Sequence, residues 1–119
     1  MLDRKLVDNI VLIKHNKNWD LDEKRVRSLA RKALDQLGLK ENIELSVIFV
    51  GRRRAKKLNQ EYRKKDYIPQ VLGFPMEKKE GVDGWIRLGD VVICTEKLKK
   101  EKTDVLYEWL IHGIRNLLI

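Results

Sequence analysis

The chain has very little cysteine and no long apolar run. Cys94 is its only cysteine, so no disulfide can form within the chain, and nothing indicates an oxidising compartment. The apolar stretch near the N-terminus is too short for a signal peptide or a membrane-spanning helix. We therefore expect a soluble, cytoplasmic protein without a membrane partner.

Internal repeats, linkers and low-complexity tracts are also missing from the sequence. A chain of 119 residues suits one domain of ordinary size. Its hydrophobic fraction of 43% is enough for a single core, and its 37% of charged residues provides a well-solvated surface. We therefore expect residues 1–119 to form one domain.

Positive charge is what the chain has in excess. It carries a net charge of +8 and has a pI of about 9.7, which favours a polyanionic partner such as RNA, DNA or an acidic membrane surface. Residues 52–65 contain one acidic residue, Glu61, and eight basic ones: Arg52, Arg53, Arg54, Lys56, Lys57, Arg63, Lys64 and Lys65. This cluster is either a solvated basic face or an anion-binding surface.

Hydrophobic periodicity predicts alternating strands and helices. The predicted strands are residues 9–16, 43–50, 71–75 and 86–95, and the predicted helices are residues 20–38, 52–63 and a last one from about Thr103 or Asp104 to the end of the chain. Asp20 and Glu23 are spaced as a capping box, and Gly38 is placed to end the first helix. This order of elements indicates an α/β or α+β sandwich.

The predicted helix 52–63 begins with three arginines. Their charge opposes the partial positive charge of the helix N-terminus, a mismatch of roughly 0.3–1 kcal/mol per residue at low salt. A phosphate bound at this terminus would reverse the sign of that effect. The alternative is that the three side chains extend into water.

The last helix places a polar pair at the border of its apolar stripe. At 100° per residue its core stripe contains Leu106, Trp109, Leu110, Gly113 and Leu117. His112 and Asn116 lie four residues apart on the border of that stripe. Ligands at a cleft have such a position, and so does a half-buried structural pair.

Three motifs occur in order along the chain: LNQEYRKKDYIPQVLGFP at residues 58–75, LGDVVICTE at residues 88–96, and His112 with Gly113. Together they resemble the YbeY family of bacterial zinc-dependent, single-strand-specific endoribonucleases and ribosomal RNA maturation factors. The resemblance covers nearly the whole chain. It implies a small mixed sheet of about four strands with helices packed against it, and a ribosomal RNA, ribosome or ribosomal-protein partner.

The resemblance also implies roles for single residues. Arg63 matches an arginine that is important for activity, and it offers a bidentate fork to a phosphate. A salt bridge to Asp66 or Glu61 is its structural alternative. Tyr62 lies on the apolar side of its helix and is interpreted as a packing residue. Gly89 and Asp90 are interpreted as a kink in a strand and a turn-side acceptor.

The zinc site of the family is incomplete in this sequence. His112 matches the first ligand, Asn116 stands at the second, and the third would fall beyond Ile119. The other histidine, His15, lies on a predicted strand. Catalytic zinc typically needs three protein ligands, so we expect zinc to bind weakly or not at all.

The sequence departs from the family pattern at other positions as well. Pro69 and Gln70 replace Thr-Asp, and Gly73 replaces a serine. The last helix ends on apolar residues without a cap, which suggests that the chain is cut inside its final element. The leading hypothesis is a maturation factor of the YbeY type with an incomplete metal site. The alternatives are an active enzyme with a rebuilt site and a non-catalytic adaptor that binds RNA or the ribosome.

Overall fold

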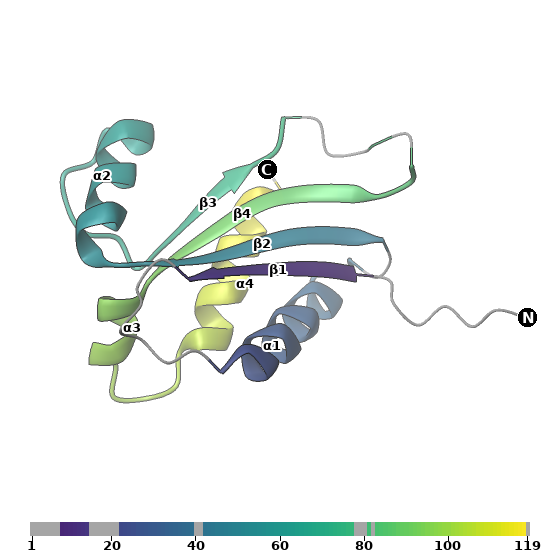
Figure 1. The fold of residues 1–119 in the computed structure, drawn as a ribbon, viewed down its shortest axis with the longest axis horizontal. Helices are drawn as coiled ribbons and strands as arrows, with labels where there is room; N and C mark the ends of the chain where they lie inside the picture. The colour runs from purple at the N-terminus through teal and green to yellow at the C-terminus, as the bar shows by residue number, and fades with distance from the viewer. Residues whose placement is uncertain (1–7, 15–21, 40–41, 78–80, 82, 119) are drawn as a thin grey trace, which may run out of the picture.

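A computed structural model describes residues 8–14, 22–39, 42–77, 81 and 83–118. Within these residues the chain forms four strands and four helices, and Figure 1 shows how they are arranged. In chain order they are β1 (Asp8–Lys14), α1 (Glu23–Gln36), β2 (Ile43–Val50), α2 (Arg52–Arg63), β3 (Val71–Pro75), β4 (Ile86–Cys94), α3 (Thr95–Lys100) and α4 (Leu106–Leu117). None of the helices in the described residues is long and apolar enough to span a membrane.

The strands form one mixed sheet in the order β1-β2-β4-β3. β1, β2 and β4 run parallel, and β3 pairs antiparallel with β4. The predicted small mixed sheet of about four strands is confirmed. The predicted Gly-Asp kink is present too: Gly89 has φ +129°, and the pairing of β2 with β4 shifts register between Glu44 and Leu45.

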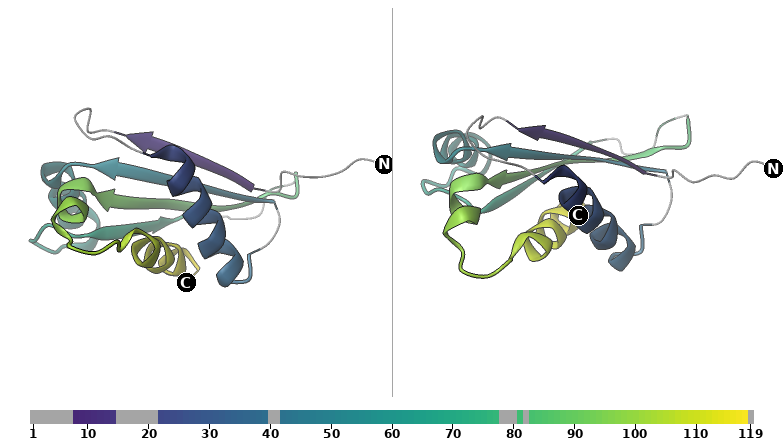
Figure 2. Two further views of the ribbon diagram at one scale, coloured as in Figure 1. Left: turned by 90° about the horizontal axis from the view of Figure 1, so that it is seen from below. Right: turned by 60° about the horizontal axis from the view of Figure 1, so that its bottom comes forward.

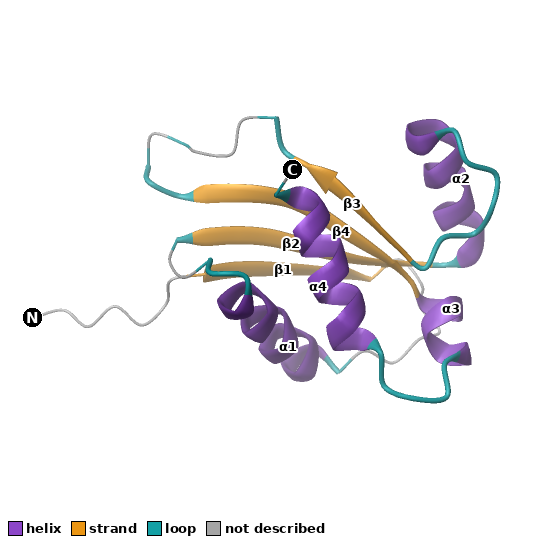
Figure 3. Ribbon diagram, turned by 180° about the vertical axis from the view of Figure 1, so that it is seen from behind, coloured by secondary structure: helices purple, strands orange, loops and turns teal. Residues whose placement is uncertain are grey.

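Helices α1 and α4 cover one face of the sheet. Figures 2 and 3 show both helices on this side. Their apolar stripes pack on alternate β2 side chains, among them Leu45, Val47 and Phe49, which are fully buried. Gly113 of α4 is part of this interface: a Cβ added there would lie 2.5 Å from Val91 Cγ1.

Among the described residues, only one end of the opposite face of the sheet is covered by a helix. α2 lies against that end (Figure 1) and buries Ala55 in a small cluster with Val50, Leu72, Val92 and Cys94. Beyond α2 the same face carries half-buried side chains such as Ser46 of β2. The sheet therefore has a closed face, under α1 and α4, and an open face.

The starts of two predicted helices differ from the structure. The N-cap of α1 is Asp22, whose Oδ1 accepts a hydrogen bond from Arg25 N at 3.1 Å, whereas the predicted cap, Asp20, lies outside the described residues. Residues 15–16 of the first predicted strand also lie outside them. α4 begins at Leu106 rather than Thr103 or Asp104, because Asp104 Oδ1 accepts the Leu106 N–H at 3.2 Å.

Candidate functional site

A cleft of about 630 Å³ lies where the loop that follows α2 meets α3 and α4. It is lined by Arg63, Tyr67, Ile68, Pro69, Gln70, Val71, Lys97, Glu108, Trp109 and His112. The structure thus brings Arg63 and His112, which the sequence singled out separately, to one cleft. Lys97 adds a second cation to its lining. The cleft can therefore accept an anionic ligand.

Arg63 is held in place by Asn59, one helical turn before it. Asn59 is fully buried, and its Nδ2 donates a hydrogen bond to the carbonyl of Tyr67 at 3.0 Å. Arg63 Nη1 lies 3.4 Å from Asn59 Oδ1 and 3.3 Å from Tyr67 Oη. Asn59 therefore joins α2 to the loop that lines the cleft. Asn59 belongs to one of the matched sequence motifs, but no role was predicted for it. Its position one helical turn before Arg63 was the feature that could have indicated this contact.

Arg63 makes no ion pair with any acidic side chain among the described residues. Asp66, one predicted alternative partner, instead accepts a hydrogen bond from Gln60 Nε2 at 2.7 Å and lies 3.8 Å from Lys56 Nζ. Glu61, the other, is exposed. The positive charge of Arg63 is therefore available for an anion in the cleft.

The two polar residues of α4 face different surroundings. His112 is exposed and lines the cleft, together with Glu108 one turn earlier. Asn116 is half-buried beside β3, with its Cβ 3.1 Å from the position that a Cβ on Gly73 would take, and it does not line the cleft. The glycine in place of the family's serine gives α4 room at this point.

The described residues do not fit a three-ligand zinc site. Within the part of the chain that the structure describes, no three His, Cys, Asp or Glu side chains come together. Cys94 is buried in the cluster under α2, and His15 lies outside the described residues. His112 is thus one imidazole in a cleft that Arg63 and Lys97 also line, and catalytic zinc sites typically have three protein ligands.

The N-terminus of α2 already has an anion. Glu96 of α3 accepts a hydrogen bond from Arg52 N at 2.8 Å through Oε1, and its Oε2 lies 3.9 Å from Arg52 Nε. This carboxylate offsets the partial positive charge of the helix terminus. The sequence allowed either a bound phosphate at this terminus or three arginines extending into water. Neither interpretation included the carboxylate of Glu96, which occupies this position.

The eight basic residues predicted to bind RNA fall into several groups. Arg52 and Lys56 pair with Glu96 and Asp66. Lys64 Nζ donates to the carbonyl of Glu61 at 3.2 Å, and Lys65 is exposed. Arg53, Arg54 and Lys57 line a shallow surface with Gly51 and make no ion pair with any described acidic residue. These three cations, like Arg63, Lys64 and Lys65, have no acidic partner among the described residues and can meet an external anion.

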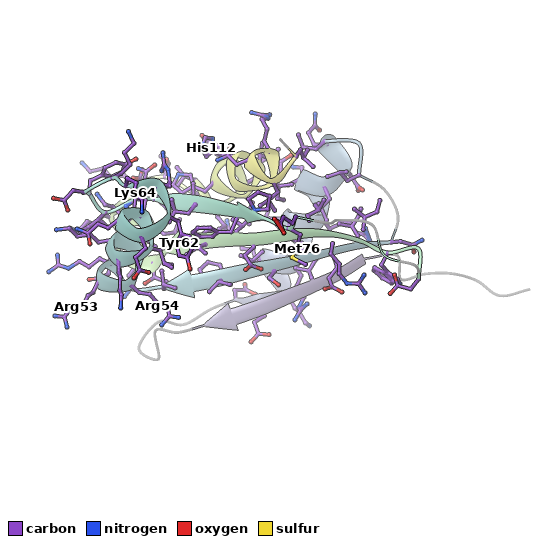
Figure 4. All side chains as sticks on the ribbon, turned by 90° about the horizontal axis from the view of Figure 1, so that it is seen from above. Arg53, Arg54, Tyr62, Lys64, Met76 and His112 are labelled. Atoms are coloured by element: carbon purple, nitrogen blue, oxygen red, sulfur yellow. The ribbon has the colours of Figure 1, made fainter. Side chains whose placement is uncertain are left out.

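Tyr62 does not pack in the core as predicted. Its exposed fraction is 65%, and its ring meets Phe74 edge-on with the centroids 5.2 Å apart. Figure 4 shows Tyr62 and Arg54 across the sheet from His112. Tyr62 lies on the same side of α2 as the buried Ala55, but at the end of the helix the sheet does not cover its ring.

Comparisons with known proteins agree with the motifs and the fold. The family described as Endoribonuclease YbeY matches residues 12–114. The chain is similar to Endoribonuclease YbeY of Aquifex aeolicus, with 34% identity over 99% of this chain and 81% of that protein, and to that of Persephonella marina, with 29% identity over 94% and 77%. The fold is similar to the solution structure of TM1509 from Thermotoga maritima, with a TM-score of 0.52 and 22% identity over 91% of this chain and 71% of that one. The chain belongs to the YbeY endoribonuclease family.

Proposed function

We propose that this chain is a ribosomal RNA maturation factor that binds single-stranded RNA in the cleft between α2 and α4. The observation that carries the proposal is the arrival of Arg63 and His112, from two distant motifs, in one cleft. Arg63 is held by Asn59 and has no carboxylate partner among the described residues. A guanidinium fixed in this way suits a bidentate contact with a phosphate.

Charge supports RNA as the ligand. Lys97 lines the cleft beside Arg63, and three further unpaired cations, Arg53, Arg54 and Lys57, lie on the same helix as Arg63. The chain carries a net charge of +8, which attracts a polyanion at long range. A single strand suits the cleft because its backbone can bend into a concave site that is lined by a tyrosine.

The test is the affinity for a short single-stranded RNA, measured by fluorescence anisotropy. Arg63→Ala should weaken binding about tenfold or more, because hydrogen bonds to charged groups contribute about 1.5–3 kcal/mol. Arg63→Lys should recover only part of the loss, since it keeps the charge but not the fork. Arg115→Ala is the matched control, an exposed arginine of α4 outside the cleft. Equal losses for Arg63→Ala and Arg115→Ala would remove the cleft from RNA binding.

A second candidate function is an active enzyme with a rebuilt metal site, and it differs from this proposal in zinc content and in RNA cleavage. Glu108 lies one turn before His112 on the cleft and favours that second candidate, because carboxylates also bind zinc. We expect dialysed protein to hold well under one equivalent of zinc and a chelator to leave its melting temperature unchanged. Stoichiometric zinc that is lost in His112→Ala and in Glu108→Gln would establish the rebuilt site. Binding to RNA without cleavage, with or without added zinc, would support the adaptor alternative.

A further inference from the structure

A second hollow, on the open face of the sheet, is separate from the cleft. This groove, of about 290 Å³, has an aliphatic floor that includes Ile48, Val50 and Val92 from β2 and β4. Leu58 and Tyr62 of α2 form one side, and Phe74 of β3 forms another. Two charged side chains, Arg54 and Asp90, complete it. We name it the tyrosine groove.

We propose that the tyrosine groove is a nucleobase pocket, in which a base of the bound RNA stacks on Tyr62 and donates a hydrogen bond from its amino group to Asp90. The inference rests on the proposed function, because it assigns a second subsite to the same RNA strand. Single-stranded RNA is commonly recognised by aromatic side chains that stack bases and by hydrogen bonds to the base edges.

The aromatic pair explains why a flat ring is the expected ligand. Phe74 is half-buried and meets Tyr62 edge-on at an interplanar angle of 72°, so one broad side of the Tyr62 ring is not used by Phe74. The ring is 65% exposed. Bases stack on such rings whatever their identity, because every base has a π-face.

The negative charge of Asp90 favours a base of the RNA over a phosphate as the occupant of the groove. This carboxylate is half-buried on β4 and has no hydrogen bond or ion pair with another described side chain. It repels a phosphate from the interior of the groove and accepts N–H donors instead. A carboxylate is a suitable partner for the amino group of cytosine, whereas uracil offers it only the ring N3–H, which lies between two carbonyl oxygens that repel a carboxylate. The groove should therefore prefer cytosine to uracil.

The cations at the mouth favour RNA over an uncharged apolar segment of a protein. Arg54 lines both the tyrosine groove and the shallow surface formed with Arg53 and Lys57, on which no described acidic side chain lies. A nucleotide with its base against Tyr62 can place its phosphate over these cations. Tyr62 and Arg63 are consecutive residues at the end of α2, so one strand that crosses this turn can reach both the groove and the cleft.

The experiment compares oligo(U) and oligo(C) of equal length by fluorescence anisotropy. Tyr62→Ala should weaken binding of both strands about tenfold, and Tyr62→Phe should restore it because the ring is retained. Tyr62→Leu keeps the apolar volume and should still be weak. Leu118→Ala removes another exposed apolar side chain, at the end of α4, and should bind like the unchanged protein. Melting curves identify any variant that has lost its fold.

Selectivity tests the role of Asp90 separately. The unchanged protein should bind oligo(C) about fivefold more tightly than oligo(U), and Asp90→Asn, which has nearly the same shape, should reduce that ratio to about one. If the protein binds RNA with Arg63 essential but Tyr62→Ala and Asp90→Asn behave like the unchanged chain, the base pocket is refuted and the groove is left for a protein contact. If the unchanged protein binds no RNA, the proposed function fails first.

Discussion

The two faces of the sheet are built from the same strands but are covered differently. On the closed face Leu45, Val47 and Phe49 of β2 are fully buried under α1 and α4. On the open face their neighbours Glu44, Ser46 and Ile48 are only half-buried. The closed face therefore accounts for most of the core, whereas the open face keeps surface that a ligand can use.

The closed face shows how near a helix can come to a sheet. A Cβ on Gly73 of β3 would lie 2.9 Å from the carbonyl oxygen of Gly113, and a Cβ on Gly113 would overlap Val91. On the open face, by contrast, Tyr62 of α2 stands out from the sheet with most of its side chain exposed. The closed face is therefore tightly packed, and the open face keeps an accessible surface.

The most demanding test of this contrast adds volume at the closed face. Gly113→Leu should lower the free energy of unfolding by about 3 kcal/mol, since overpacking a well-packed core typically costs about 1–3 kcal/mol and the new side chain meets Val91. Ser46→Val adds volume to the open face and should change stability by about 0.5 kcal/mol or less. Urea denaturation measures both. Similar values for the two variants would mean that α4 is not closely packed on the sheet.

The next effect concerns the joint between α2 and the cleft. Asn59→Ala should destabilise the protein by about 1–3 kcal/mol, because the carbonyl of Tyr67 loses its donor from a buried amide. RNA affinity should fall as well, because Arg63 loses the side chain that positions it. Gln60→Ala, in which an exposed neighbour loses its hydrogen bond to Asp66, is the control and should leave both quantities nearly unchanged. A loss of stability without a loss of affinity would contradict the positioning role.

The basic residues of α2 also differ from one another, because some are paired with acidic side chains and others are not. Arg53→Gln with Lys57→Gln removes two unpaired cations, whereas Arg52→Gln with Lys56→Gln removes two that already have acidic partners. Both double variants change the net charge equally. The salt dependence of RNA affinity should become shallower by about 0.7 log units per decade of salt for each phosphate that the protein no longer neutralises, and by more in the first variant. Equal slopes would indicate that only net charge matters.

Much of the fold follows from periodicity in the sequence. The bounds of β2, α2 and β3 match the predicted residues 43–50, 52–63 and 71–75, because alternation and helical spacing extend through each of them. The core stripe of α4 is buried as predicted, and Ile114 joins it. Gly38 has the left-handed φ of +80° that was expected at the end of α1.

What the sequence did not predict depends on contacts between distant segments. α3 is a short lysine-rich helix whose first residue, Thr95, is buried and donates to the carbonyl of Val50 at 3.2 Å. Glu96 reaches the start of α2 across 44 positions. The exposure of Tyr62 depends on how far a sheet extends under α2. The metal ligands at His112 and Asn116 stay a prediction.

The weakest effect that we expect lies at the far end of the open face, where Arg87 bridges Asp83 and Glu44 at 2.9 Å and 3.6 Å. The hydrogen bond from Arg87, with another from the backbone N–H of Trp85, lowers the pKa of Asp83 from 3.8 to about 2. A pKa that is lower in the folded state stabilises the protein above about pH 4, and this contribution is lost as the pH falls through about 2. It should be small because both side chains are partly exposed and salt screens them.

A carboxyl NMR titration should therefore give a midpoint near 2 for Asp83, and Arg87→Gln should raise it towards 3.8. The stability difference between the unchanged protein and Asp83→Asn should be present at pH 7 and disappear as the pH falls to about 2. A midpoint for Asp83 near 4 in the unchanged protein would mean that the ion pair does not form in solution. The polar end of the open face would then have no stable ion pair between Arg87 and Asp83.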